Sequence, residues 1–392
     1  MNIDRTPIDS YFPDMQSAYK AARSVSQAVS DHFYKHHRDV FLHPEPLLAS
    51  PPSPQVIEAI IDTTFWTSLR KEEGRSPKIS IAYLSPDQAD NPLVLGEMLP
   101  FNANSLTKLA PAVERSGIHL GVWAYDNELY VWGTTRQIPA LCFVLEVIEP
   151  GMLVIKHRRI DGFGKFVNVA VLKGDQVKII DENSGRVPAC PNVVNSMMGF
   201  NSATIWNDSL NVLVQLAVSM RDHGRGGILL VVPSGSDSWR ESIIHPISYA
   251  VEPAYSELAG LRDQVSNNTK SGIWQSKLTA AIHNLAGLTA VDGATIINEN
   301  YELLAFGAKI GRSAKGSPVE EMLVTEPIIG NEGKVIHPVQ NGGTRHLSAA
   351  QFIHDQHDAT ALVASQDGKF TIFSWTPYKQ KVQAHRVDAL LL

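Results

Sequence analysis

Cysteines and long apolar runs are scarce in this 392-residue chain, and both shortages restrict what it can be. Its two cysteines, Cys142 and Cys190, form no CxxC pair and are too few for a disulfide framework, so we expect a reducing, cytoplasmic location. Apolar runs never reach the roughly 18 residues of a membrane helix, which predicts no membrane span. The polar segment MNIDRTPIDSYFPDM has no signal-peptide pattern.

An excess of positive charge is also absent. The formal net charge is −6 and the pI is about 6.2, which argues against broad binding to nucleic acid or to an anionic membrane. A nucleotide site needs only a few local cations, so this class of ligand stays open. The length predicts two domains, with three as the alternative, each large enough to bury a core without metal or disulfide staples.

The first half of the chain predicts an α+β domain, with helices first and a mostly antiparallel sheet after them. Apolar residues at helical spacing predict helices over 18–40 and 54–73, separated by a proline-rich loop. From about residue 77 the period changes to alternation. Residues 117–135 predict a hairpin that turns at Asp126 and Asn127.

The second half interleaves helices and strands, which predicts an α/β or α+β domain with a mixed sheet flanked by helices. Residues 183–204 are loop-like, and the expected organisation is a first domain over 1–190, a linker over 191–204 and a second domain over 205–392. Within the second domain, residues 288–311 predict two strands joined by a turn at Asn298 to Asn300.

Asp292-Gly293-Ala294 is the first candidate for chemistry. It follows the apolar run 288–291, so we expect a carboxylate at a strand edge beside a residue without a side chain, which leaves room for a ligand. Asp292 could then bind a divalent cation or accept a hydroxyl proton. The alternative is an ordinary Asp-Gly turn.

Gly342-Gly343-Thr344-Arg345-His346 is the second candidate. It opens the predicted helix, and two glycines before a helix N-terminus favour an anion site. Arg345 adds a guanidinium that can hold a phosphate with two hydrogen bonds, and His346 adds a donor of tunable charge. The alternative is that Thr344 only caps the helix and Arg345 is a surface charge.

The two motifs in this order, DGA and then TRH, resemble the signature of diadenylate cyclases, which join two ATP molecules into cyclic di-AMP. The resemblance covers residues 205–376 and extends to Arg225-Gly226-Gly227, to Gly307 and to Ser365-Gln366-Asp367, which it implies to lie on the last strand. It implies a Mg²⁺ or Mn²⁺ ion on Asp292 and a reaction between two protomers that meet face to face. The catalytic residues that it implies are Asp292, Arg345 and His346, and the implied nucleotide contacts are Gly293, Ala294, Gly343, Thr344, Arg345, His346, Ser365 and Gln366.

Two departures from the family pattern bear on activity. Leu347 stands where many members have a second arginine, and Gln366-Asp367 replaces the usual pair of glutamates. An uncharged amide is a weak ligand for a hard cation. A degenerate fold that senses ATP or a cyclic dinucleotide without turnover is therefore the alternative function.

The first domain has no motif that predicts catalysis. Residues 120–135 and 162–175 resemble the N-terminal sensor domains that bacteria fuse to diadenylate cyclases, which implies a small-molecule ligand of unknown identity. The basic, glycine-rich stretch 156–165 predicts either an anion site or a solvated strand edge. His32 and His36 have the spacing of helical zinc ligands, although a solvated face is the ordinary interpretation. Trp123 and Trp132 are expected in the core or in hairpin pairs, or lining a small-molecule pocket.

Overall fold

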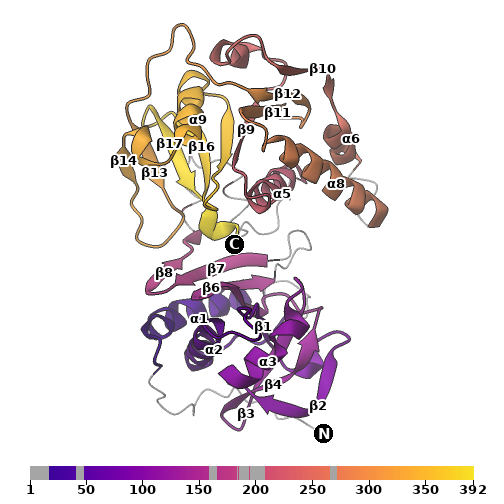
Figure 1. Ribbon diagram of the computed structural model, residues 1–392. Coiled ribbons are helices and arrows are strands. Elements are labelled where there is room, and N and C mark those ends of the chain that lie inside the picture. Colours follow the sequence, from indigo (N-terminus) through magenta and orange to yellow (C-terminus); the bar gives the residue numbers. More distant parts are fainter. Residues whose placement is uncertain are drawn as a thin grey trace. The chain divides into compact units, whose positions relative to one another are not determined.

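The computed structural model describes residues 17–40, 48–158, 166–182, 184, 194, 208–264 and 272–392. The chain divides into two compact units, one of Met1–Ile180 with Leu392 and one of Asp181–Leu391. Each unit combines helices with a mixed sheet (Figure 1). The predicted linker over 191–204 lies outside the described residues except for Val194. No helix within the described ranges combines the length and the apolar character needed to cross a membrane.

The first unit contains an eight-stranded sheet with the order β2-β4-β3-β1-β5-β6-β7-β8. Every pair of neighbours is antiparallel except β1 and β3, which confirms the predicted, mostly antiparallel sheet. Asp126 and Asn127 adopt positive φ values of 45° and 64°, as the turn of a tight hairpin requires. The strands are β1 (Ser80–Tyr83), β2 (Leu93–Pro100), β3 (His119–Tyr125), β4 (Glu128–Thr135), β5 (Phe143–Glu149), β6 (Met152–Arg158), β7 (Phe166–Lys173) and β8 (Gln176–Ile179).

Three helices cover one face of this sheet, α1 (Lys20–Val40), α2 (Pro54–Ser68) and α3 (Ala103–Val113), and their apolar residues share one core with it. Helix α2 begins where the sequence predicts, because the Ser53 side chain accepts a hydrogen bond from the Val56 N–H. It ends at Ser68, before the predicted Glu73. The Leu69–Glu73 segment that follows has largely exposed side chains, so it adds little apolar surface to that core.

The second unit contains a nine-stranded sheet with the order β10-β12-β11-β9-β15-β16-β17-β13-β14, in which β9–β11 and β13–β17 are parallel. Helix α9 (Thr344–Asp355) packs over β15, β16 and β17 (Figure 1). The other helices are α5 (Asp208–Asp222), α6 (Glu257–Asp263) and α8 (Gly272–Leu288). The strands are β9 (Gly227–Val232), β10 (Tyr249–Tyr255), β11 (Ala294–Asn298), β12 (Leu303–Ala308), β13 (Met322–Thr325), β14 (Lys334–Ile336), β15 (Thr360–Ala364), β16 (Phe370–Thr376) and β17 (Lys381–Arg386).

Two local expectations for this unit are wrong. The apolar run 288–291 is not a strand, because Leu288 ends α8 and the next three residues form turns that hydrogen-bond back to that helix. An apolar run this short does not distinguish a buried helix end from a strand. Ser365 to Asp367 lie in the turn between β15 and β16 rather than on the last strand, which is β17.

Two buried histidines of this unit predict that its folding stability falls in acid. Burial lowers the pKa of His346, and it lowers the pKa of His385 to about 4. An unfolded histidine titrates near 6.5, so between about pH 6.5 and pH 4 the unfolded chain binds more protons, and stability falls as the pH falls.

We expect His385 alone to contribute on the order of 3 kcal/mol that is present above about pH 6.5 and lost by about pH 4. Urea denaturation at a series of pH values measures this loss. The variant His385→Phe should show a shallower decline over the same range. Equal slopes for the variant and the wild type would contradict the assignment.

Candidate functional site

The motif segments of the second unit meet at one edge of its sheet. Strands β9 and β11 run parallel with Ile228 opposite Ala294, so the residues that precede them lie side by side. Strand β15 is antiparallel to β9 and ends at Ala364 opposite Gly227, which brings Ser365 to the same edge. Register alone therefore gathers three segments that are far apart in the sequence.

Arg345 joins this edge from the first turn of α9. A Cβ atom on Gly226 would lie 3.1 Å from the Arg345 Nη1 atom and 3.2 Å from the Ala364 carbonyl oxygen, so the guanidinium packs against the start of β9. Arg345 also lies close enough to Asp292 to help lower the pKa of its carboxyl. Together with Ser365, these contacts bring all four motif segments to one place.

Asp292 is exposed and ionised. Its side chain is 89% accessible and forms an ion pair with Lys309, which is the main cause of the lowered carboxyl pKa. Sequence reasoning did not single out Lys309. The β11–β12 hairpin places it there, because Ala294 pairs with Ala308. Any cation that binds Asp292 must displace or share this partner.

Gly293 has a structural reason to be glycine. Its φ is +118°, and a Cβ atom there would lie 2.5 Å from the Gly307 carbonyl carbon. Gly307 has a φ of +60° and packs against the Tyr249 ring. The pairing of β11 with β12 thus requires both glycines, independently of any ligand.

Gly293→Ala is therefore expected to destabilise the protein by about 2 kcal/mol or more, through backbone strain and a main-chain clash. The melting temperature of this unit should fall by roughly 4–8 °C. Gly287→Ala is the control, because Gly287 lies inside α8 with open space around it and should gain about 0.5–1 kcal/mol. Differential scanning calorimetry measures both, and an unchanged melting temperature for Gly293→Ala would refute the clash.

The N-terminus of α9 is open to a ligand. Gly343 is the N-cap residue, has no side chain to cap the helix, and has open space around its Cα. Thr344 is exposed. A helix leaves its first N–H groups without intrahelical acceptors and carries positive partial charge at this end. This arrangement suits a phosphate group.

His346 differs from its neighbours because it is buried. Its Nε2 atom lies 3.3 Å from the Thr371 Oγ1 atom, and its Nδ1 atom faces Gly342. Burial and the nearby Arg386 lower its pKa, so the ring is neutral at pH 7. Its implied catalytic role stays a prediction, and the structure favours a neutral ring over a charged phosphate ligand.

The turn after β15 neutralises part of its own charge. Asp367 accepts hydrogen bonds from the Ser365 hydroxyl and, at 2.6 Å, from the Lys369 ammonium, and its pKa is lowered to about 2. Gln366 is exposed and uncharged. Asp367 is thus a charged carboxylate that the turn already uses.

Sites predicted in the first unit have varied outcomes. Trp132 is buried and donates a hydrogen bond to the Leu84 carbonyl oxygen, and Trp123 pairs with Tyr130 across the hairpin, as predicted for core and hairpin residues. His32 and His36 are half-buried, so each ring is partly exposed to solvent. Their ring centroids lie 4.4 Å apart, and the buried His157 lies 5.4 and 6.1 Å away.

The basic stretch is described only in part. Residues 159–165 lie outside the described ranges. Lys156 forms an ion pair with Glu146, and burial lowers its pKa to about 8. The pairing shows that this lysine belongs to the sheet.

Comparisons with known proteins bear mainly on the first unit. No curated protein matches the chain. A solved structure, the hypothetical membrane spanning protein from Bacillus cereus, matches at 12% identity with a TM-score of 0.25, over 46% of this chain and 66%, just under two thirds, of that one. At that TM-score the likeness supports no conclusion about a shared fold. A family model described as "Probable sensor domain DACNV" matches residues 47–136. The segment from α2 to β4 is therefore similar to a probable sensor domain.

Proposed function

We propose that this chain is a diadenylate cyclase whose activity is controlled by its N-terminal sensor segment. The observation that carries the proposal is the meeting of Gly226, Asp292, Arg345 and Ser365 at one sheet edge. The match to a probable sensor domain of the DACNV family supports it, because such domains accompany diadenylate cyclases.

In the proposed reaction the 3′-hydroxyl of each ATP attacks the α-phosphorus of the other. Each new P–O bond forms as the bond from that phosphorus to the oxygen bridging to the β-phosphate breaks, and each hydroxyl proton passes to water. Two pyrophosphates leave and cyclic di-AMP remains. Little covalent chemistry falls to the protein, so positioning and charge stabilisation are its main tasks.

The residues fit a metal ion that arrives with the nucleotide. Asp292 offers one exposed carboxylate, whereas Asp367 is held by its turn. Mg²⁺ is commonly bound by one or two carboxylates together with substrate phosphates and water. Asp292 would thus hold Mg²⁺ or Mn²⁺, which when bound supplies charge neutralisation at the phosphates.

The phosphates would lie between Arg345 and the N-terminus of α9. The guanidinium is fixed against Gly226, and Gly343 leaves the helix N–H groups accessible. Thr344 adds a hydroxyl. The backbone at Gly293 and Ala294, with Ser365 and Gln366, would line the nucleoside side. The neutral His346 would hold this end of α9 against β16 through its contact with Thr371.

Self-association is part of the proposal, because each protomer holds one ATP. Apolar side chains next to the motifs are exposed, with 36% accessibility at Val291, 36% at Leu347 and 50% at Tyr249. Such groups beside a charged site favour contact with a second copy.

A second candidate function is nucleotide sensing without turnover. Compared with the family pattern, Leu347 replaces a cationic arginine and Gln366 replaces a charged glutamate. Lys309 competes with a metal ion for the Asp292 carboxylate. The same site would then bind ATP or a cyclic dinucleotide and report it.

The two candidates differ in their products. The full-length protein is incubated with ATP and Mn²⁺ or Mg²⁺ at several protein concentrations, and cyclic di-AMP is sought by chromatography and mass spectrometry. The proposal expects product and pyrophosphate, and none from 3′-deoxy-ATP. Saturable ATP binding without product favours the sensor, and product gained in the Leu347→Arg, Gln366→Glu double variant would then locate the defect. If the protein neither binds ATP nor forms product, both candidate functions are rejected.

A further inference from the structure

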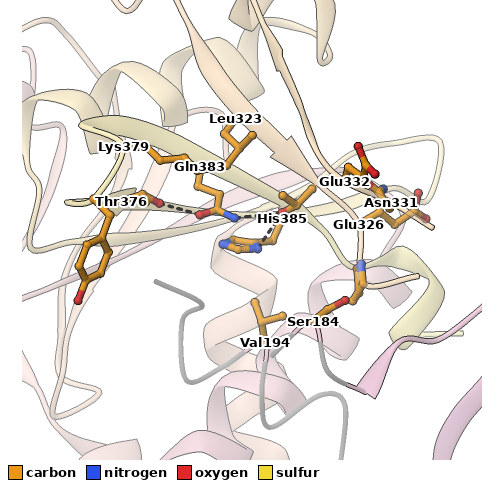
Figure 2. Close-up of a pocket in the computed structure, with 13 residues that line it drawn as sticks. Ser184, Val194, Leu323, Glu326, Asn331, Glu332, Thr376, Lys379, Gln383 and His385 are labelled. Carbon is orange, nitrogen blue, oxygen red and sulfur yellow. Dashed lines mark hydrogen bonds between the residues drawn. The ribbon is translucent and has the colours of Figure 1, made fainter. Parts of the chain in front are cut away.

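Arg386 is the last residue of β17, and its side chain lies beside the first turn of α9. His385 lines a pocket on one face of this strand (Figure 2), whereas Ala384 joins the core that α9 shares on the other face. Side chains alternate along a strand, so Arg386 lies on the α9 face with Ala384. Arg386 also pairs with Thr371 of β16, whose hydroxyl oxygen lies 3.3 Å from the His346 Nε2 atom.

Two hydrogen bonds hold the guanidinium of Arg386 in place. Its Nε and Nη2 atoms donate to the Asn341 Oδ1 atom at 3.1 and 2.8 Å. Asn341 is buried and comes directly before Gly342 and Gly343, the N-cap residue of α9. The acceptor is a neutral amide, and among the described residues Arg386 forms no ion pair with a carboxylate. A positive charge is therefore fixed next to these two glycines without being neutralised.

Positive charge is in excess around His346. Burial is the main cause of its lowered pKa, and among the charged side chains Arg386 lowers that pKa the most. Lys369 and Arg345 also lower it, whereas Asp367 raises it. Lys369 and Asp367 form an ion pair, so these three cations and one carboxylate leave the charges of the two arginines uncompensated. Both arginines are half-buried, and such a site attracts an anion with several negative charges.

Strand order places the two arginines on different sides of the first turn of α9. Arg345 packs against Gly226 at the start of β9. Arg386 ends β17, which is three strands further along the sheet and therefore about 14 Å away from β9. His346 contacts β16, which lies between these strands. Asp292 lies on the β9 side, so the reacting α-phosphate would bind near Arg345 and the outer phosphates near Arg386.

We propose that Arg386 holds the β- and γ-phosphates of ATP and makes this site selective for nucleoside triphosphates over monophosphates. The inference rests on the proposed function, because it concerns the same nucleotide site. Asn341 orients one edge of the guanidinium, and the remaining N–H groups can donate to phosphate oxygens. These two phosphates leave as pyrophosphate, so Arg386 would also stabilise the charge that develops on the leaving group.

Isothermal titration of the full-length protein tests the inference with ATP, pyrophosphate and AMP, each in the presence of Mg²⁺. Arg386→Ala should raise the Kd of ATP and of pyrophosphate by about 10-fold or more, because a charged partner of the outer phosphates is lost. The Kd of AMP should stay close to the wild-type value. Lys381→Ala is the control, because Lys381 lies at the other end of β17 and pairs with Glu321, and all three affinities should be unchanged.

Two further variants separate the charge of Arg386 from its structural contact with Asn341. Arg386→Gln keeps an N–H donor for Asn341 but removes the charge, so it should lose as much ATP affinity as Arg386→Ala. It also preserves the test if Arg386→Ala folds poorly. Leu347→Arg adds a cation on the exposed side of the same helical turn. It should raise ATP affinity by a larger factor in the Arg386→Gln background than in the wild type, whereas independent effects would be equal in both.

Three results would each overturn the inference: wild-type ATP affinity in Arg386→Gln, equal losses of ATP and AMP affinity, or equal gains from Leu347→Arg in both backgrounds. If the wild type forms cyclic di-AMP and one of these results is found, the proposed function stands and only the inference fails. If ATP binding depends on Arg386 but no product forms, the inference holds for the sensor and the cyclase is rejected. A wild type that does not bind ATP rejects both.

Discussion

Asp292→Asn is expected to abolish cyclic di-AMP formation, with turnover reduced by at least about 100-fold. The amide keeps the shape of the side chain but removes the charge that would hold the nucleotide-borne cation. Since Asp292 is 89% exposed, its replacement should leave the fold intact. Product formation at saturating ATP and Mn²⁺ measures the effect, and circular dichroism checks the fold.

Asp367→Asn is the matched control for that experiment. Asp367 is also an exposed, ionised aspartate at this sheet edge, but it is bound by Ser365 and Lys369 within its turn. Its loss should change turnover by a few-fold at most. If Asp367→Asn were the inactive variant and Asp292→Asn the active one, the cation would belong to the turn after β15.

Arg345→Ala should weaken ATP binding by roughly 10- to 100-fold, the loss expected when a phosphate is deprived of a charge-assisted pair of hydrogen bonds. The guanidinium is already positioned against Gly226 and the Ala364 carbonyl, so the wild type loses little side-chain entropy on binding. Isothermal titration with Mg²⁺ and ATP measures the affinity. Arg345→Lys should recover part of it, because lysine keeps the charge but not the fork.

Lys369→Ala serves as the control for charge alone. It removes a cation near the same edge that is paired with Asp367, so ATP affinity should change little. If the Arg345→Ala protein bound ATP as tightly as the wild type, the phosphates would not bind at the N-terminus of α9. Because Asp292→Asn acts on turnover and Arg345→Ala on binding, the two variants separate the chemistry from the nucleotide site.

Signals that act over a few residues predicted local structure well. Asp126 and Asn127 identified the β3–β4 turn because few other residues tolerate positive φ in succession. Pro54 is compatible with the start of α2 predicted from the sequence, because the first turn of a helix tolerates proline. The run 288–291 was misassigned, because its apolar side chains suit the buried end of a helix as well as a strand.

The amino-acid sequence by itself determined which groups this protein has for chemistry: an aspartate followed by a glycine, and an arginine on the first turn of a glycine-preceded helix. Only the tertiary structure decided which other residues these groups contact. Strand order brings Gly226, Asp292 and Ser365 together and pairs Asp292 with Lys309, and the packing of α9 adds Arg345. Burial makes His346 neutral at pH 7 and lowers the pKa of His385 to about 4. Such contacts join residues far apart in the chain, and desolvation depends on everything packed around a group, so neither is encoded in local spacing.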